Sequence, residues 1–127
     1  MDKLKIGLYG YGKVAELHAR AIASVPGLEL VSVCGRDSAK AAAFAARWSI
    51  QARASAAEMA DLDGAQAAII TTPHPLHRSH SVECSLAGLH VLVEKPMALS
   101  VEDCDAMIAA AAGVGRLLGV ILSLIHI

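Results

Sequence analysis

The sequence lacks any concentration of charge of one sign. Its 11 lysines and arginines are balanced by 12 aspartates and glutamates, which leaves a formal net charge of -1 over 127 residues, and no run of five basic residues occurs. Proteins that bind nucleic acid or anionic membrane surfaces usually carry a basic patch or stripe. The composition therefore argues against both kinds of partner.

Cysteine is scarce, and its spacing fits neither a disulfide framework nor a zinc knuckle. Cys34, Cys84 and Cys104 are odd in number, widely separated and never arranged as C-x-x-C. Disulfide-stabilised domains and zinc knuckles depend on paired or closely spaced cysteines. We therefore expect a protein of a reducing compartment and predict a cytoplasmic location.

Long uninterrupted hydrophobic runs are also missing, although 55% of the residues are hydrophobic. The N-terminal stretch MDKLKIGLYG has early charges and no cleavage-type ending, unlike a signal peptide. Near the other end, Arg116 and neighbouring glycines break the apolar segment 107–127 into pieces shorter than the roughly 20 residues of a membrane helix. No membrane partner is expected, and the length suits a single domain.

A regular alternation of apolar extended segments and helical segments is present instead. Strands are expected at residues 4–10, 28–34, 51–54, 67–71, 90–93 and 116–121. Helices are expected at residues 12–25, 37–48, 55–63, 76–87 and 100–112. Apolar strands that alternate with helices predict an α/β fold, a doubly wound parallel sheet covered on both faces. Ligands of such sheets bind at the carboxyl ends of the strands.

The first predicted strand is followed by GYGKVA, residues 10–15, which matches the pattern G-x-G-x-x-A. In dinucleotide-binding folds the first glycine permits a tight turn, the second lets the backbone approach a pyrophosphate, and the alanine allows close helix packing. The start of the helix adds free N–H groups and a positive dipole end. A plain structural turn is the alternative, but the strand-loop-helix context favours a dinucleotide site. The predicted contacts are Gly10, Tyr11, Gly12, Lys13 and Val14.

The end of the second predicted strand bears on the type of dinucleotide. NAD-binding proteins commonly place an acid here, where it binds the ribose hydroxyls. In this sequence Gly35 leaves room and Arg36 offers a guanidinium group that suits a 2′-phosphate. NADP is therefore favoured over NAD, with both residues as contacts. Asp37 is expected mainly to cap the next helix, although it could reach the ribose and restore NAD binding.

Three histidines, His74, His77 and His80, recur at intervals of three residues. The spacing invites a metal-binding interpretation, but no carboxylate or cysteine completes a ligand set, and Pro75 separates His74 from the helix. We predict no metal site. His77, in the first turn of its helix, is expected to line the cofactor edge, and His80 is expected to be an ordinary surface residue.

The stretch HVLVEKPMALS, residues 90–100, ends an apolar strand on Glu94, Lys95 and Pro96. A residue before proline is held extended, so Lys95 is expected to project toward the crevice at the strand ends. Near the positive ring of a nicotinamide, a lysine can exchange a proton with a substrate hydroxyl or carbonyl. An exposed ion pair without function is the alternative, but the position at the carboxyl edge favours a catalytic role.

Taken together, GYGKVAELHA, TTPHPLH and AGLHVLVEKPMALS resemble the N-terminal half of the glucose-fructose oxidoreductase / inositol dehydrogenase / rhizopine catabolism family. The resemblance covers residues 3–120 and implies that residues 1–121 form a Rossmann domain that binds NAD or NADP. It implies that Lys95 is the catalytic lysine, which polarises or deprotonates the reacting carbinol, and that Glu94 lies near the nicotinamide ribose. It also implies that the cofactor is bordered by Thr72, Pro73 and His77.

The sequence departs from the family pattern in three ways. His74 stands where asparagine is frequent, and Gly35 stands where an acid is frequent, which supports NADP. Family members also continue into a second α/β domain that supplies the substrate pocket, whereas this sequence stops where the sixth strand should be finishing. Its last residues, LSLIHI at 122–127, match the translation of a transposon mosaic end used in sequencing libraries, and we expect an adapter scar on a truncated chain.

The resemblance predicts an NAD(P)-dependent dehydrogenase or reductase that acts on a sugar, a polyol or a related hydroxyl or carbonyl compound. The substrate would bind through the missing domain, the full-length protein would form a homo-oligomer, and the fragment alone would be inactive. The alternative is a stand-alone dinucleotide-binding or redox-sensing module without catalysis.

Overall fold

A computed structural model describes residues 2–121 of the chain. The predicted adapter scar, residues 122–127, lies outside the described residues. The strands are β1 (Leu4–Tyr9), β2 (Leu28–Cys34), β3 (Gln51–Arg53), β4 (Ala67–Ile70), β5 (His90–Glu94) and β6 (Leu118–Ile121). The helices are α1 (Lys13–Ser24), α2 (Ser38–Trp48), α3 (Ala56–Asp63), α4 (His77–Leu86) and α5 (Val101–Gly113), with a 3₁₀ turn η1 (His74–Leu76) before α4. Every predicted element is confirmed, with ends shifted by two residues at most.

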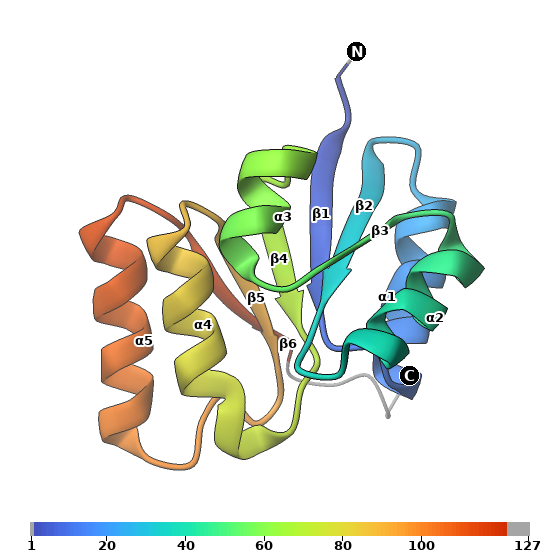
Figure 1. The fold of residues 1–127 in the computed structure, drawn as a ribbon. Coiled ribbons are helices and arrows are strands. Elements are labelled where there is room, and N and C mark those ends of the chain that lie inside the picture. Colours follow the sequence, from blue (N-terminus) through green and yellow to red (C-terminus); the bar gives the residue numbers. More distant parts are fainter. Residues whose placement is uncertain (1, 122–127) are drawn as a thin grey trace.

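The strands form one sheet in the order β3-β2-β1-β4-β5-β6, and all neighbouring strands are parallel. The chain winds outward from β1 to β3 and then crosses to β4 on the other side of β1 (Figure 1). The connections that leave β1 and β4 therefore diverge, and a crevice opens outside their carboxyl ends. This topology confirms the predicted doubly wound sheet.

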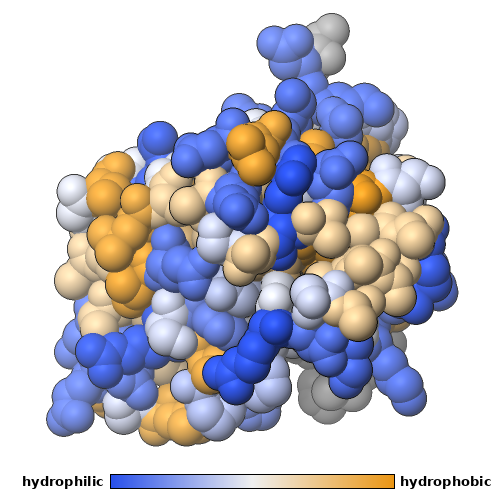
Figure 2. All heavy atoms as spheres, viewed as in Figure 1, coloured by the Kyte–Doolittle hydropathy of each residue, from blue (hydrophilic) through white to orange (hydrophobic). Residues whose placement is uncertain are grey.

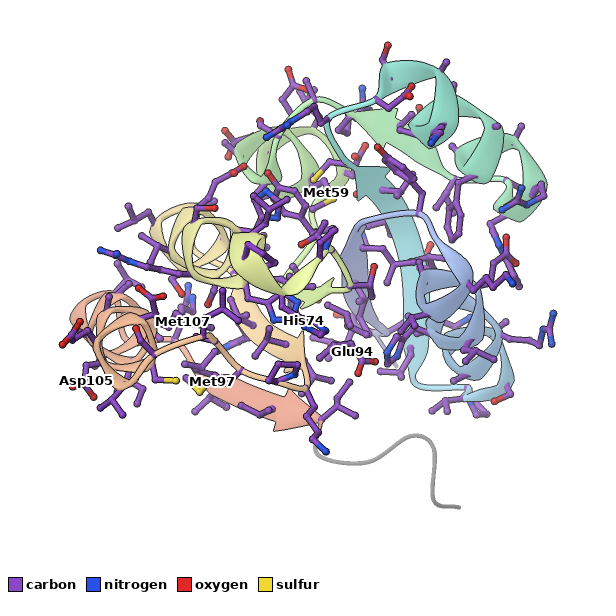
Figure 3. All side chains as sticks on the ribbon, turned by 90° about the horizontal axis from the view of Figure 1, so that it is seen from below. Met59, His74, Glu94, Met97, Asp105 and Met107 are labelled. Carbon is purple, nitrogen blue, oxygen red and sulfur yellow. The ribbon has the colours of Figure 1, made fainter. Side chains whose placement is uncertain are left out.

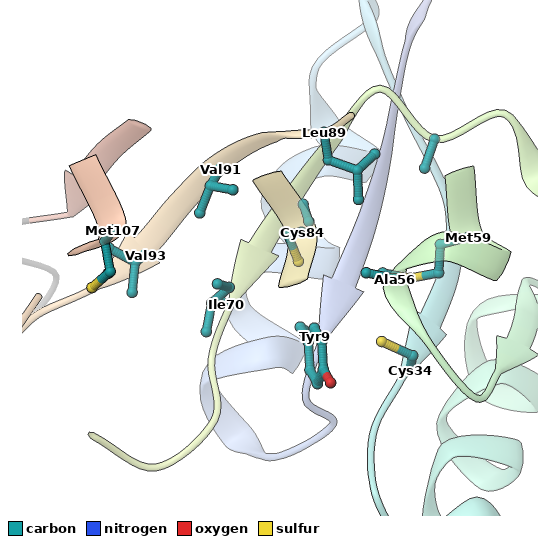
Figure 4. Packing of buried hydrophobic residues seen from close by; sticks show 12 residues of the cluster. Tyr9, Cys34, Ala56, Met59, Ile70, Cys84, Leu89, Val91, Val93 and Met107 are labelled. Atoms are coloured by element: carbon teal, nitrogen blue, oxygen red, sulfur yellow. The ribbon is translucent and has the colours of Figure 1, made fainter. Parts of the chain in front are cut away.

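Helices cover both faces of the sheet, as a parallel sheet requires. Helices α3, α4 and α5 lie on one face, while α1 and α2 lie on the other (Figure 1). One buried cluster, on the α3–α5 face, is shown in Figure 4 and includes Tyr9, Cys34, Met59, Ile70, Cys84, Leu89, Val91, Val93 and Met107. The second cluster, on the α1–α2 face, consists of Ile6, Leu8, Ala15, Ala19, Ile22, Val33, Phe44, Ala45 and Ile69.

Polar side chains define the starts of three helices. The Asp37 carboxylate accepts hydrogen bonds from the backbone N–H groups of Ala39 and Lys40, each at 3.1 Å. Ser55 and Ser100 accept from the third residue of α3 and α5, at 3.2 and 3.1 Å. Each such cap contributes about 1 kcal/mol. The cap expected at Asp37 is therefore confirmed.

The outer surface of the α3–α5 face mixes hydrophilic and hydrophobic residues (Figure 2). Hydrophobic side chains gather over α5, at the left of that view, where Val101 and Ile108 are exposed. None of the helices described within residues 2–121 combines the length and the hydrophobicity that a membrane crossing requires.

Candidate functional site

A cleft of about 640 Å³ lies at the carboxyl ends of β1, β2 and β4. This volume is within the range of about 300–1,000 Å³ that is typical of small-molecule sites. Figure 3 looks onto this edge of the sheet, with His74 and Glu94 near its centre. The lining residues are Gly10, Tyr11, Gly12, Gly35, Arg36, Lys40, Thr71, Thr72, Pro73, His74, Leu76 and His80. Seven of the predicted contacts therefore line one cleft.

The two glycines of the loop after β1 are required for different reasons. Gly10 has φ of +118°, and a Cβ atom there would lie 2.4 Å from the Thr71 hydroxyl oxygen. Its N–H donates to the Cys34 carbonyl at 2.9 Å, which ties the loop to the end of β2. Gly12 has an ordinary extended backbone, and a Cβ atom there would meet nothing within 4 Å. Gly10 is thus needed by the fold, whereas the space beside Gly12 is open.

Gly12 is also the N-cap of α1, and no side chain caps this helix. The first N–H groups of a helix need partners from outside the helix, and they form a favourable site for an anion. The predicted contacts Lys13 and Val14 lie in this first turn and are exposed, but neither lines the cleft. The start of α1 can therefore hold a phosphate group through its backbone.

The connection from β2 to α2 forms one wall of the cleft. The backbone N–H of Asp37 donates to the Tyr11 hydroxyl at 3.0 Å, while the Asp37 carboxylate caps α2. Asp37 therefore fills its predicted role as a helix cap. Arg36 and Lys40 are exposed and line the cleft beside it. The sequence did not predict that Lys40 lines the cleft, because Lys40 is far from the glycine loop in sequence and belongs to no recognised motif.

His77 is placed differently from the sequence expectation. It was expected to line the cofactor edge, but it is fully buried and is absent from the cleft lining. Its Nδ1 lies 2.8 Å from the Pro96 carbonyl oxygen and its Nε2 lies 2.7 Å from the Thr72 carbonyl oxygen. A ring nitrogen donates to a carbonyl oxygen only when it carries a proton. His77 connects the loop after β4 to the loop after β5.

His80 corrects a second expectation, because it is not an ordinary surface residue. It is partly buried, lines the cleft, and stacks on Tyr9 with ring centroids 4.0 Å apart. Its Nδ1 lies 2.8 Å from the Thr72 hydroxyl oxygen. The Tyr9 hydroxyl in turn donates to the Glu83 carboxylate at 2.7 Å. No sequence pattern indicates this stack, since β1 and α4 meet only in the folded sheet.

Burial shifts the pKa values of the two stacked residues, Tyr9 and His80, in opposite directions. It raises the pKa of the Tyr9 hydroxyl, and the hydrogen bond to Glu83 raises that pKa further. Burial lowers the pKa of His80 because it disfavours the charged ring. His77 and Arg36 lower this pKa as well, while the Glu83 carboxylate raises it. A neutral His80 in the cleft is therefore favoured.

This lowered pKa predicts a loss of stability in acid. Below the ordinary value of 6.5, the unfolded chain takes up a proton at His80 more readily than the folded chain does. The free energy of unfolding should therefore fall as the pH is lowered from about 7.5 to about 5. The variant His80→Gln should lose less stability over this interval, as measured by urea unfolding at each pH. Equal losses in both chains would contradict the assignment.

Glu94 and Lys95 lie at the end of β5, outside the cleft lining. The Glu94 carboxylate is 2.5 Å from His18 Nε2 of α1, and the two side chains are only 15% and 10% exposed. The sequence did not predict this pair, because His18 and Glu94 lie 76 positions apart. Lys95 is exposed, and its backbone N–H donates to the Ile121 carbonyl at 3.1 Å. Helix α1, which starts at the glycine loop, therefore positions Glu94, the residue before Lys95, through His18.

Within residues 2–121, no three histidine, cysteine or acidic side chains converge as a metal site would require. Cys34, Cys84 and Cys104 are all free thiols. Burial raises the pKa of the Cys34 thiol to about 12, with smaller contributions from nearby carboxylates. Because the thiolate is the reactive form, this cysteine is poorly suited to nucleophilic chemistry.

Comparisons with known proteins agree with this geometry. A family model described as "Oxidoreductase family, NAD-binding Rossmann fold" matches residues 4–122. Glucose-6-phosphate 3-dehydrogenase of Bacillus subtilis is 31% identical over 103 residues, which cover 81% of this chain and 29% of the relative. The chain spans about a third of the length of the curated relatives that it matches.

Solved structures show the same fold. The WlbA dehydrogenase of Chromobacterium violaceum, in complex with NADH and UDP-GlcNAcA, has a TM-score of 0.87 and 37% identity, covering 95% of this chain and 35% of that one. Biliverdin reductase of Synechocystis, in complex with biliverdin and NADP+, has a TM-score of 0.81 and 26% identity, covering 92% of this chain and 37% of that one. Both forms of the nicotinamide cofactor therefore occur among the similar structures.

Proposed function

Because the chain belongs to the oxidoreductase family with an NAD-binding Rossmann fold, we propose that it forms the dinucleotide-binding domain of a dehydrogenase or reductase. The observation that carries the proposal is the open, uncapped start of α1 at Gly12, on the same cleft as Arg36. Backbone N–H groups there bind the pyrophosphate, and the cleft beside them receives the adenosine end.

The residues present fit the cofactor on physical grounds. The Cβ position of Gly12 faces open space, so a phosphate can approach the backbone without displacing any side chain. When bound, the nicotinamide supplies the hydride acceptor or donor, and the protein supplies binding and orientation. Thr72 and Pro73, which line the cleft after β4, border the cofactor on the side opposite to β2.

The cleft favours NADP over NAD in this proposal. A ribose-binding acid is absent at Gly35, and the Asp37 carboxylate accepts hydrogen bonds from two backbone N–H groups of α2. Two cationic side chains, Arg36 and Lys40, line the same wall. A guanidinium group pairs well with a phosphate, and the ammonium group adds a second positive charge. This wall therefore suits a 2′-phosphate better than two ribose hydroxyls.

The proposed reaction transfers hydride between the cofactor and a carbon of a sugar, a polyol or a related hydroxyl or carbonyl compound. Similar proteins named for glucose 6-phosphate and inositol support this substrate class. Lys95 moves the proton of the reacting hydroxyl, and His18 holds Glu94 in place beside it. A second domain completes the substrate pocket in a cytoplasmic homo-oligomer.

Calorimetric titration of the chain with NADPH and with NADH tests the proposal. We expect NADPH to bind about tenfold more tightly or better, the effect of one hydrogen bond to a charged group. Arg36→Ala should remove most of this preference while leaving NADH binding nearly unchanged. Arg20→Ala, an exposed arginine that does not line the cleft, is the matched control. Binding of neither nucleotide would refute the function, and equal binding of both would refute only the preference.

A further inference from the structure

The ring of Tyr11 covers Gly35 at the end of β2. A Cβ atom built on Gly35 would lie 2.2 Å from Tyr11 Cε2, 2.9 Å from Cδ2 and 3.1 Å from Cζ. The ring is held there, because its hydroxyl accepts the hydrogen bond from the Asp37 N–H at 3.0 Å. Tyr11 also packs against the buried cluster on the α1–α2 face. The contact therefore joins the glycine loop to the connection between β2 and α2.

The Tyr11 ring is the nearest obstacle to a side chain at Gly35. The φ of Gly35 lies outside the left-handed region, in contrast to that of Gly10, so its backbone is one that other residues can adopt. The three nearest atoms to the built Cβ all belong to Tyr11. Removal of the ring should therefore clear the nearest obstacle to a side chain at position 35.

We propose that Tyr11 and Gly35 form a coupled pair that determines which dinucleotide the cleft accepts. The phenol ring occupies the space that a ribose-binding carboxylate at position 35 would need. The ring therefore excludes the acid that favours NAD and leaves this end of the cleft to Arg36 and Lys40. The inference rests on the proposed dinucleotide binding, and it adds a specificity-determining role for the residue between the two loop glycines.

The contact between Tyr11 and Gly35 predicts that an acid introduced at position 35 will not by itself improve the binding of NADH. In Gly35→Asp the new side chain and the Tyr11 ring cannot occupy the same space, so the ring must move and lose its bond to Asp37. Because Tyr11 lines the cleft, a displaced ring obstructs the adenosine end for either nucleotide. In Tyr11→Ala/Gly35→Asp the carboxylate has room to face the ribose.

Titrations of four chains with NADPH and NADH test the coupling: the unaltered chain, Gly35→Asp, Tyr11→Ala and the double variant. Gly35→Asp alone should weaken NADH binding, whereas the double variant should bind NADH about tenfold more tightly than Gly35→Asp does and should prefer NADH to NADPH. If Gly35→Asp alone binds NADH as tightly as the double variant, the coupling is refuted. If the unaltered chain binds neither nucleotide, the proposed function itself fails.

Thermal unfolding gives a second readout that needs no ligand. Gly35→Ala should lower the melting temperature in the Tyr11 background and in Tyr11→Phe, which keeps the ring and removes only the hydroxyl. It should have little effect in Tyr11→Ala, where the obstructing ring is gone. A drop of equal size in all three backgrounds would overturn the proposal even if every chain binds NADPH.

Discussion

Replacement of Gly12 with valine is expected to abolish dinucleotide binding while leaving the fold intact. A Cβ atom at this position would have no atom beyond its chain neighbours within 4 Å, and the backbone is extended rather than left-handed. The added methyl groups would instead fill the space through which a pyrophosphate reaches the start of α1. We expect the dissociation constant for NADPH to rise at least about a hundredfold, or roughly 2.7 kcal/mol.

Two other glycines provide the comparisons for this experiment. Gly27, in the turn between α1 and β2, also has open space at its Cβ position, so Gly27→Val should preserve both stability and binding. Gly10→Ala should instead destabilise the fold, because φ is +118° and the Thr71 hydroxyl oxygen is only 2.4 Å from the new atom. Melting temperatures and calorimetric titrations separate the three cases. Normal NADPH binding by folded Gly12→Val would show that the pyrophosphate binds elsewhere.

Replacement of Lys95 with alanine in the full-length protein should remove turnover and spare cofactor affinity. Lys95 is exposed at the end of β5 and does not line the cleft that we assign to the adenosine end. Loss of a positioned acid or base typically lowers the rate by about 10²- to 10⁴-fold. We expect kcat to fall by this amount while the dissociation constant for NADPH stays within about twofold, since the pyrophosphate contacts are elsewhere.

The same variant separates catalysis from a redox-sensing role. A stand-alone sensor needs cofactor binding but has no use for a proton-transferring lysine. Lys3→Ala, an exposed lysine just before β1, is the matched control and should change neither quantity. If Lys95→Ala weakens NADPH binding as much as it slows turnover, Lys95 is a binding residue and the catalytic assignment is wrong.

Local sequence signals were sufficient to predict the fold. The capping side chains Asp37, Ser55 and Ser100 act within three residues of themselves, so the helix starts could be recognised from short segments. The apolar runs then gave the strands, and their alternation with helices gave the parallel sheet. The G-x-G-x-x-A pattern located the cleft for the same reason, because strand, loop and helix are consecutive in the chain.

Contacts between distant segments could not be predicted in the same way. His18 pairs with Glu94 across 76 positions, and His80 stacks on a tyrosine of β1. The helical spacing of the histidines was visible, but it does not reveal which of them faces the cleft and which is buried against two carbonyls. The two loop glycines are a contrasting case, because the local pattern already gave them different roles, and the structure shows Gly10 required by backbone geometry and open space beside Gly12.

The sheet places the last residue of β1 and the loop that follows it in two separate environments. Tyr9 belongs to the buried cluster beneath α3–α5, while Tyr11 packs against the cluster beneath α1–α2. Substitutions at sites with no shared partners usually combine additively. Packing changes beside Tyr9 and beside Tyr11 should therefore combine nearly additively, whereas Arg36 and His80 stay linked through the charge of the guanidinium group. The packing around Tyr11 could thus evolve without a matching change in the packing beneath α3–α5.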